Sequence, residues 1–393
     1  MKHKLIIIAV VSLGACLSFA GERIEKEFDV SAGELLEIDL GTGGSIDIMG
    51  WEDNKISVKA YLSGPDGEDC IVEFDDKPTG LEISSHYDHR WRSRSSNIEF
   101  EIRLPAKFDL DIETNGGDIA VENVEGDLLG TTHGGDLDLA SLKGDIRFNT
   151  NGGNVVCHNI YGLADLETNG GDITCTDSEI NGQAHTNGGR VIIRNVSGDF
   201  ECTTNGGEVS YENDDNLTAQ KPTEVIRIST MGGDIDVDNA PLGADLHTNG
   251  GDIQIKSAGQ FVQASTNGGN IYIGQIDGWV DVSTNGGDIV VTVIGEEKKQ
   301  KRDIDLRSNG GEIELTLPAD FSAEFDIELA YTKRSRRTYE IISDFDLKLS
   351  ESDEWQYDHG SARKYIEGKG AIKDGHNKIR IATINGDVVI RKR

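Results

Sequence analysis

The sequence has few basic residues for its length. Lysine and arginine number 38 against 70 aspartate and glutamate residues in 393, so the formal net charge is −32. Because binding to nucleic-acid phosphates needs a basic face, this balance argues against nucleic acid as a partner. Proline is also scarce at 6 residues, whereas glycine reaches 48.

Several familiar functional signals are absent. After the first 20 residues no stretch is apolar and long enough to cross a bilayer. Neither a Ser-His-Asp arrangement nor a His-Glu-x-x-His motif is found, which argues against two common classes of hydrolase. The four cysteines after residue 20 (Cys70, Cys157, Cys175 and Cys202) show no zinc-site spacing.

The amino terminus has the pattern of an export signal. Lys2 and Lys4 precede an apolar run over residues 5–13, and small residues follow. Cleavage after residue 20 is favoured, which makes 1–20 a signal peptide. The alternative is a lipobox at residues 13–16, which would make Cys16 a lipidated first residue and the only link to a membrane. Both readings predict an exported protein that is periplasmic, at the cell surface or secreted.

The most informative feature present is a recurring pair of glycines. Eight of the ten intervals between pairs are 18 residues long, and the other two are 26 and 24. A fixed period of this length predicts a solenoid, here of about eleven coils. The first glycines of the pairs are Gly116, Gly134, Gly152, Gly170, Gly188, Gly206, Gly232, Gly250, Gly268, Gly286 and Gly310.

Each unit has room for two short strands and no helix. If the first glycine is place 1, places 4 and 6 are apolar, as are places 13 and 15, and place 9 adds a further apolar column. Alternation with period two is typical of a strand with one buried face. Like residues then stack about 4.8 Å apart in successive coils. The predicted fold is an all-β, single-chain β-solenoid with atypical β-rich caps at both ends.

A Thr-Asn-Gly-Gly motif marks the boundary between units. Asparagine followed by glycine tolerates the positive φ of a tight turn, and stacked asparagines can form a hydrogen-bond ladder. We therefore expect a valine at Gly250 to be costly. The residues predicted to form this structural turn include Asn115, Gly116, Gly117, Asn249, Gly250, Gly251, Asn285, Gly286 and Gly287.

The third place of the unit is mostly acidic. Asp118, Asp136, Asp234, Asp252 and Asp288 are examples. The column is either a solvated acidic edge or a ladder that binds structural calcium, although the spacing differs from that of calcium-binding β-rolls. The sequence indicates no other cofactor.

Cys157 and Cys175 occupy the same inward place in consecutive coils. Their Cα atoms should lie within disulfide range, but parallel side chains approach each other poorly for a bond. Either a bridge or two buried thiols fits this arrangement.

The chain divides into four segments on these patterns. They are the signal peptide at 1–20, a β-rich cap at 21–113, the repeat solenoid at 114–317, and a C-terminal excursion with a closing coil at 318–393. Atypical terminal coils protect the open ends of a solenoid against polymerisation, so we expect a monomer.

Basic and aromatic residues gather outside the regular coils. Arginine and aromatic side chains together are typical of binding hot spots, although solvated loops have the same composition. The candidate partner contacts are Arg90, Trp91, Arg92 and Arg94 in one cluster, and Lys333, Arg334, Arg336 and Arg337 in another.

The tandem Gly-Gly-Asp-Ile-x-Val units and the lead-in at residues 99–105 resemble the bacterial "putative adhesin" repeat family. This resemblance implies a β-solenoid of the cell envelope that attaches to surfaces. It supplies no catalytic or binding residues.

The sequence thus favours a non-enzymatic secreted or envelope-associated module, an adhesin or a structural element, whose partner is a protein or glycan at the cell surface. Two alternatives remain open: a scaffold that polymerises end to end, and a β-helical enzyme that acts on polysaccharides.

Overall fold

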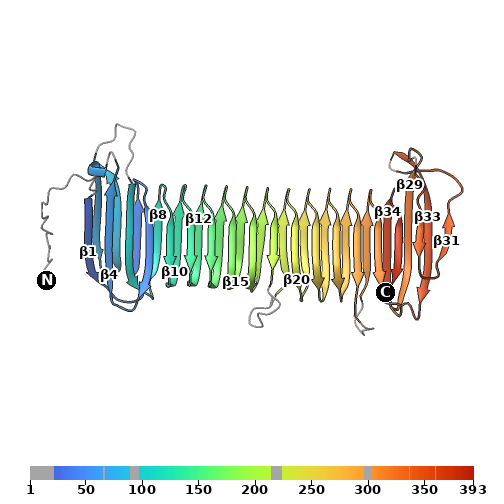
Figure 1. The fold of residues 1–393 in the computed structure, drawn as a ribbon, viewed down its shortest axis with the longest axis horizontal. Coiled ribbons are helices and arrows are strands. Elements are labelled where there is room, and N and C mark those ends of the chain that lie inside the picture. Colours follow the sequence, from blue (N-terminus) through green and yellow to red (C-terminus); the bar gives the residue numbers. More distant parts are fainter. Residues whose placement is uncertain are drawn as a thin grey trace.

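The computed structural model describes residues 22–64, 67–88, 97–213, 224–295, 302–335, 337–358 and 360–393. They form one long rod of strands, with β1 at one end and β31 at the other (Figure 1). The predicted all-β solenoid is confirmed. The predicted signal peptide with Cys16 lies outside the described residues, as do Arg90, Trp91, Arg92, Arg94 and Arg336. Within the described ranges no helix has the length and apolarity to span a membrane.

The regular part of the rod has two columns of strands. Each coil contributes one strand to each column, and each strand pairs in parallel with its equivalent in the next coil. The first column contains β9 (Ile119–Glu122), β11 (Leu137–Ala140), β13 (Val155–His158), the first half of β15 (Ile173–Thr186), β16 (Val191–Ser197), β18 (Val209–Glu212), β20 (Ile235–Ala240), β22 (Ile253–Ala258), β24 (Ile271–Ile276), β26 (Ile289–Val293) and β28 (Ile313–Leu317). The second contains β8 (Asp109–Thr114), β10 (Glu125–Thr132), β12 (Lys143–Thr150), β14 (Tyr161–Thr168), the second half of β15, β17 (Phe200–Thr204), β19 (Ile226–Thr230), β21 (Ala244–Thr248), β23 (Phe261–Thr266), β25 (Trp279–Thr284) and β27 (Ile304–Ser308).

The core lies between the two columns and follows the repeat. The residues at places 4 and 6, such as Leu137 and Leu139, are fully buried, and so are the place 9 residues such as Leu142. The threonine column beside them is also buried. Thr132 Oγ1 donates to the carbonyl oxygen of Gly117 in the preceding coil at 2.9 Å, and this bond recurs along the rod.

The boundary turn has the predicted asparagine ladder, but the reason predicted for its glycines was wrong. Asn169 Nδ2 donates to Asn151 Oδ1 at 2.7 Å, and the pattern continues upward. Of all the paired glycines, however, only Gly117 has a positive φ, at 112°. The second glycine is needed because neighbouring coils approach closely: a Cβ at Gly135 would lie 1.9 Å from the Gly117 carbonyl oxygen.

Positive φ occurs instead at the other turn of the coil. Asn123, Ser141, Asn159, Asp177 and Asn195 all have φ between 50° and 59° at place 8 of their units. Short polar side chains tolerate this left-handed conformation better than branched ones. The five residues belong to the first five coils, before the longer interval that follows Tyr211.

The acidic third place has a structural role. Asp118 Oδ1 accepts the backbone N–H of Asp136 at 2.8 Å, and Asp234 Oδ1 accepts that of Asp252 at 2.7 Å. Each of these carboxylates therefore caps the backbone of the next coil. Among the residues that the structure describes, no group of three or more His, Cys, Asp or Glu side chains could hold a metal ion.

Cys157 and Cys175 are paired in register, as predicted, and both are free, fully buried thiols. Cys202 is also buried and free.

At both ends a coil is separated in sequence from its neighbours in space. β2 (Leu35–Leu40) and β3 (Ser45–Trp51) stack on β8 and β9, although β4–β7 intervene in the chain. Similarly, β34 (Asn377–Ile384) and β35 (Val388–Lys392) stack on β27 and β28. The other end elements are β1 (Glu22–Asp29), β4 (Lys55–Ser63), the 3-10 turn η1 (Gly67–Asp69), β5 (Cys70–Lys77), β6 (Gly80–Tyr87), β7 (Asn97–Pro105), β29 (Ala323–Thr332), β30 (Ile341–Ser343), β31 (Lys348–Glu351), β32 (Gln356–Asp358) and β33 (Ser361–Ile372).

Among the strands that the structure describes, antiparallel pairing is confined to these ends. β1 pairs with β4, β4 with β7 and β5 with β6 at one end, while β33 pairs with β29, β31 and β32 at the other. A change of strand direction interrupts the repeating parallel edge on which another coil could stack.

Candidate binding site at the C-terminal end

The C-terminal end of the rod differs in charge from the rest of the chain. Residues 331–393 contain 14 lysine and arginine residues and 10 aspartate and glutamate residues, whereas the whole chain has 38 and 70. The last part of an acidic protein is therefore slightly basic. Such a local reversal favours contact with acidic partners.

Aromatic and basic side chains meet at this end around Trp355. The Tyr331 ring meets the indole edge-on, with centroids 5.7 Å apart and an interplanar angle of 81°. The Lys333 and Lys364 ammonium groups lie 5.9 and 5.8 Å from the indole centroid, within cation–π range. We call these four residues the tip cluster. Tyr331 and Lys364 are direct partners in the pairing of β29 with β33, which positions the cluster.

The Tyr331 hydroxyl connects the tip cluster to β31. It donates a hydrogen bond to the Glu351 carboxylate. Burial, together with this hydrogen bond and the carboxylate charge, raises the pKa of Tyr331 to about 12. The phenol therefore stays protonated at neutral pH and holds Glu351 near the cluster.

The predicted basic residues of this region separate into two environments. Lys333 and Arg334 are exposed and, with Tyr357, line a shallow hollow of about 320 Å³. Tyr357 is 85% exposed, so its ring is accessible to a partner. Arg337 instead forms an ion pair with Asp387 at 2.5 Å and is used within the cap.

The predicted turn residues do not gather into a site. They lie one above another along a single edge of the rod, where Asn267 Nδ2 donates to Asn249 Oδ1 at 2.9 Å and Asn285 Nδ2 to Asn267 Oδ1 at 2.7 Å. Their role is to join coils. Asn115 Nδ2 donates a hydrogen bond to the Gly41 carbonyl oxygen of the N-terminal cap at 2.8 Å.

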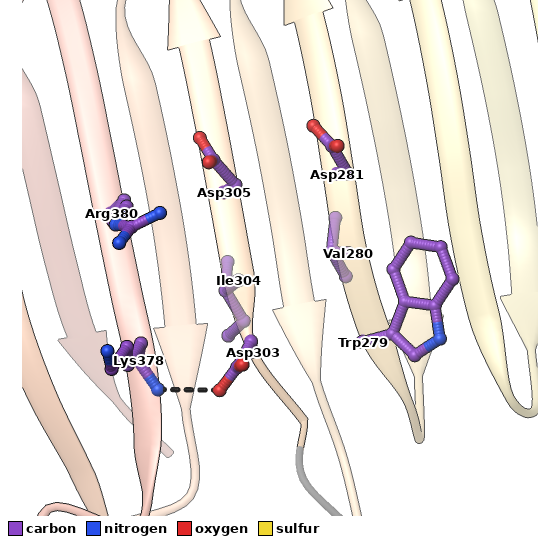
Figure 2. A pocket seen from close by; sticks show the side chains of 8 residues that line it. All are labelled: Trp279, Val280, Asp281, Asp303, Ile304, Asp305, Lys378 and Arg380. Carbon is purple, nitrogen blue, oxygen red and sulfur yellow. Dashed lines mark hydrogen bonds between the residues drawn. The ribbon is translucent and has the colours of Figure 1, made fainter.

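A groove that the sequence analysis missed lies on the outer face of β25, β27 and β34. Its volume is about 350 Å³, with Trp279 on one side and Lys378 and Arg380 on the other, while Asp303 and Asp305 lie between them (Figure 2). The only signal in the sequence was that Phe261 and Trp279 share place 12 of their units. That signal does not show which residues lie next to Trp279.

The fold and these surfaces define a class: a capped β-solenoid whose regular coils are structural and whose distinctive side chains gather near one end. A family model described as Toastrack DUF4097 matches residues 34–292. The chain therefore belongs to the Toastrack family. The match covers the N-terminal cap except β1, and most of the coils. No curated protein matches the chain.

Solved structures with similar strand arrangements are distant. They include a protein titled "putative cell adhesion protein" from Clostridium sporogenes, with 9% identity, coverage of 95% of this chain and 100% of that one, and a TM-score of 0.19. A "putative adhesin" from Parabacteroides distasonis has 12% identity, coverage of 73% and 98%, and a TM-score of 0.29. A "putative lipid binding protein" from the same species has 13% identity, coverage of 73% and 97%, and a TM-score of 0.24. Such low scores say nothing about what this chain binds.

Proposed function

We propose that the protein is an exported, non-enzymatic module that binds an acidic protein or glycan surface at the cell envelope through its C-terminal end. The observation that carries the proposal is the tip cluster with the exposed Lys333, Arg334 and Tyr357 beside it. Aromatic and cationic groups that share a hollow supply both apolar contact and charge to a partner. The signal pattern at 1–20 supports export; under the alternative lipobox cleavage, a lipid on Cys16 would anchor the N-terminal end of the chain to a membrane.

The outer faces of the coils support a binding role over catalysis. One row of outward positions reads Asp236, Gln254, Tyr272 and Val290 in successive coils. The residue type in this row differs from coil to coil, which suits contact with a partner surface better than a repeated set of catalytic acids. The antiparallel ends favour a single rod over an end-to-end polymer, so we propose a monomer.

The proposal is tested with the full mature chain, immobilised and exposed to peptidoglycan, charged glycans and extracellular matrix proteins. The double variant Lys333→Glu with Arg334→Glu should weaken binding at least tenfold, and wild-type binding should fall as salt rises. The control is Lys143→Glu with Arg147→Glu, which reverses two exposed charges on the regular coils. Because these residues pair with Glu125 and Asp145, thermal unfolding of the control checks that it keeps its fold. Equal binding by both double variants would contradict the proposal.

A further inference from the structure

The groove of Figure 2 is a second surface, separate from the tip cluster. We propose that it binds a neutral oligosaccharide, with a sugar ring against Trp279 and hydroxyl groups bonded to the acidic and basic side chains opposite. The inference does not depend on the tip cluster, and either site can fail while the other stands.

Trp279, the aromatic wall of the groove, is the last ring of a two-ring stack that ends abruptly. Phe261 and Trp279 occupy equivalent positions in successive coils, with ring centroids 4.8 Å apart and planes at 10°. In the coil before, Gly243 leaves space for the phenyl ring, since a Cβ there would lie 2.3 Å from it. In the coil after, Val280 pairs with Ile304, which puts the short Asp303 beside Trp279. The aromatic column stops there, and the cavity opens beside the indole.

This wall suits a sugar because one face of a pyranose ring is lined by C–H groups. Such a face packs well on a large flat aromatic surface, and ligand pockets commonly combine an aromatic wall with a few polar groups. Trp279 is only half-buried although it stacks on Phe261. Part of its surface is therefore free for a ligand.

The opposite side supplies hydrogen-bond donors that have no other use. Within the described residues, neither the Lys378 ammonium nor the Arg380 guanidinium forms an ion pair, and the bond from Lys378 to Asp303 at 2.8 Å comes from the backbone N–H. In contrast, Arg307 on the neighbouring strand is paired with Asp305. These two cationic groups can donate hydrogen bonds to sugar oxygens.

The charges of the groove favour a neutral ligand. Asp281, Asp303 and Asp305 supply acceptors, and Lys378 and Arg380 supply donors, so neither sign dominates. Sugar hydroxyls both donate and accept, and can use both kinds of group. Trp279 and Arg380 lie two strands apart, which is about 10 Å at ordinary strand spacing and wide enough for two linked sugar rings.

Calorimetric titration of the full mature chain with neutral trisaccharides of glucose, mannose and N-acetylglucosamine tests this inference. At least one should bind, Trp279→Ala should lose affinity at least tenfold, and Arg380→Ala should lose it severalfold. Tyr272→Ala is the matched control, since Tyr272 is an outward aromatic residue, 48% exposed, on β24 in the other column. It should bind like the parent.

Three results would overturn the inference: no binding by any neutral trisaccharide at millimolar concentration, equal binding by Trp279→Ala, or a preference for an acidic trisaccharide. Thermal unfolding of each variant, with Trp279→Phe as a conservative replacement expected to retain binding, separates a lost contact from a lost fold. The variant Lys333→Glu with Arg334→Glu should bind the trisaccharide normally, which keeps this test independent of the proposed partner surface.

Discussion

Replacing Gly251 with alanine should destabilise the rod far more than replacing its neighbour Gly250. A Cβ at Gly251 would lie 2.1 Å from the Gly233 carbonyl oxygen and 2.6 Å from Asp234 Oδ1, both on the preceding coil. A Cβ at Gly250 would meet nothing closer than 3.4 Å, at the Gly232 carbonyl oxygen. The two glycines are adjacent in sequence but face different degrees of crowding.

The size of the effect follows from what must move. Relieving the clash at Gly251 requires its coil to move away from the preceding coil, which weakens the bonds from Thr248 Oγ1 to the Gly233 carbonyl oxygen at 2.9 Å and from the Asp252 N–H to Asp234 Oδ1 at 2.7 Å. Each is worth about 1 kcal/mol net, and overpacking strain adds about 1–3 kcal/mol. We expect Gly251→Ala to lower the free energy of unfolding by about 3 kcal/mol. Gly250→Ala should change it by less than about 1 kcal/mol, since it removes chain freedom without a clash.

The assay is urea unfolding followed by circular dichroism, together with hydrogen exchange. Exchange is needed because repeat proteins can open locally, and a single midpoint then underreports the change. In Gly251→Ala, amides of the coils on either side of the substitution should exchange faster than those near the caps. A Gly251→Ala protein that unfolds with the parent, or a larger loss in Gly250→Ala, would refute the close-approach explanation of the glycine pair.

Three further predictions concern single side chains. Asp252→Ala should cost about 1–2 kcal/mol in urea unfolding because Asp252 Oδ1 accepts the Asn270 N–H at 2.6 Å, whereas Asp252→Asn keeps an acceptor and should be near neutral; equal costs would contradict the capping role. Burial and the nearby Glu208 charge raise the pKa of Asp236, so the folded protein disfavours the ionised carboxylate. Asp236→Asn should therefore be more stable than the parent at pH 7, by less than about 0.5 kcal/mol. In melting curves this gain should vanish at low pH, where Asp236 is protonated in both the folded and the unfolded protein. Burial raises the pKa of the Cys202 thiol, so thiol reagents should label it only after unfolding, and rapid labelling of the native protein would show that this coil opens.

The sequence predicted the parts of the fold that repeat. Eleven aligned units reveal an inward column such as Leu137 and Leu139 because each residue faces the same surroundings as its equivalent in the next coil. The residues with positive φ at place 8, such as Asn123 and Ser141, were missed because the residue type at this place varies among asparagine, serine and aspartate although the backbone conformation is the same. The reason for the second glycine was also missed, since it depends on the distance between coils and not on the turn itself.

The candidate sites were less predictable because they depend on the parts that do not repeat. The basic character of Lys333 and Arg334 was visible in the sequence, but their neighbour Trp355 is placed by the antiparallel pairing of β33. The groove joins Trp279 to Arg380 across about a hundred residues of chain. It exists because an interval of 24 residues brings Asp303 beside Trp279, and a returning strand adds Arg380. No local sequence pattern predicts that Trp279, Asp303 and Arg380 lie close together.

Because the coils stack at a constant spacing, adding or removing one coil would change the length of the rod by one fixed increment. Because the equivalent strands β21, β23 and β25 differ by a fixed sequence offset, removing 18 consecutive residues from this stretch would rejoin like positions and leave every remaining ladder in register. Such a deletion would shorten the rod by one strand spacing, about 4.8 Å, and leave both ends unchanged. The number of coils therefore sets the distance between the two capped ends of the rod, independently of what either end contains.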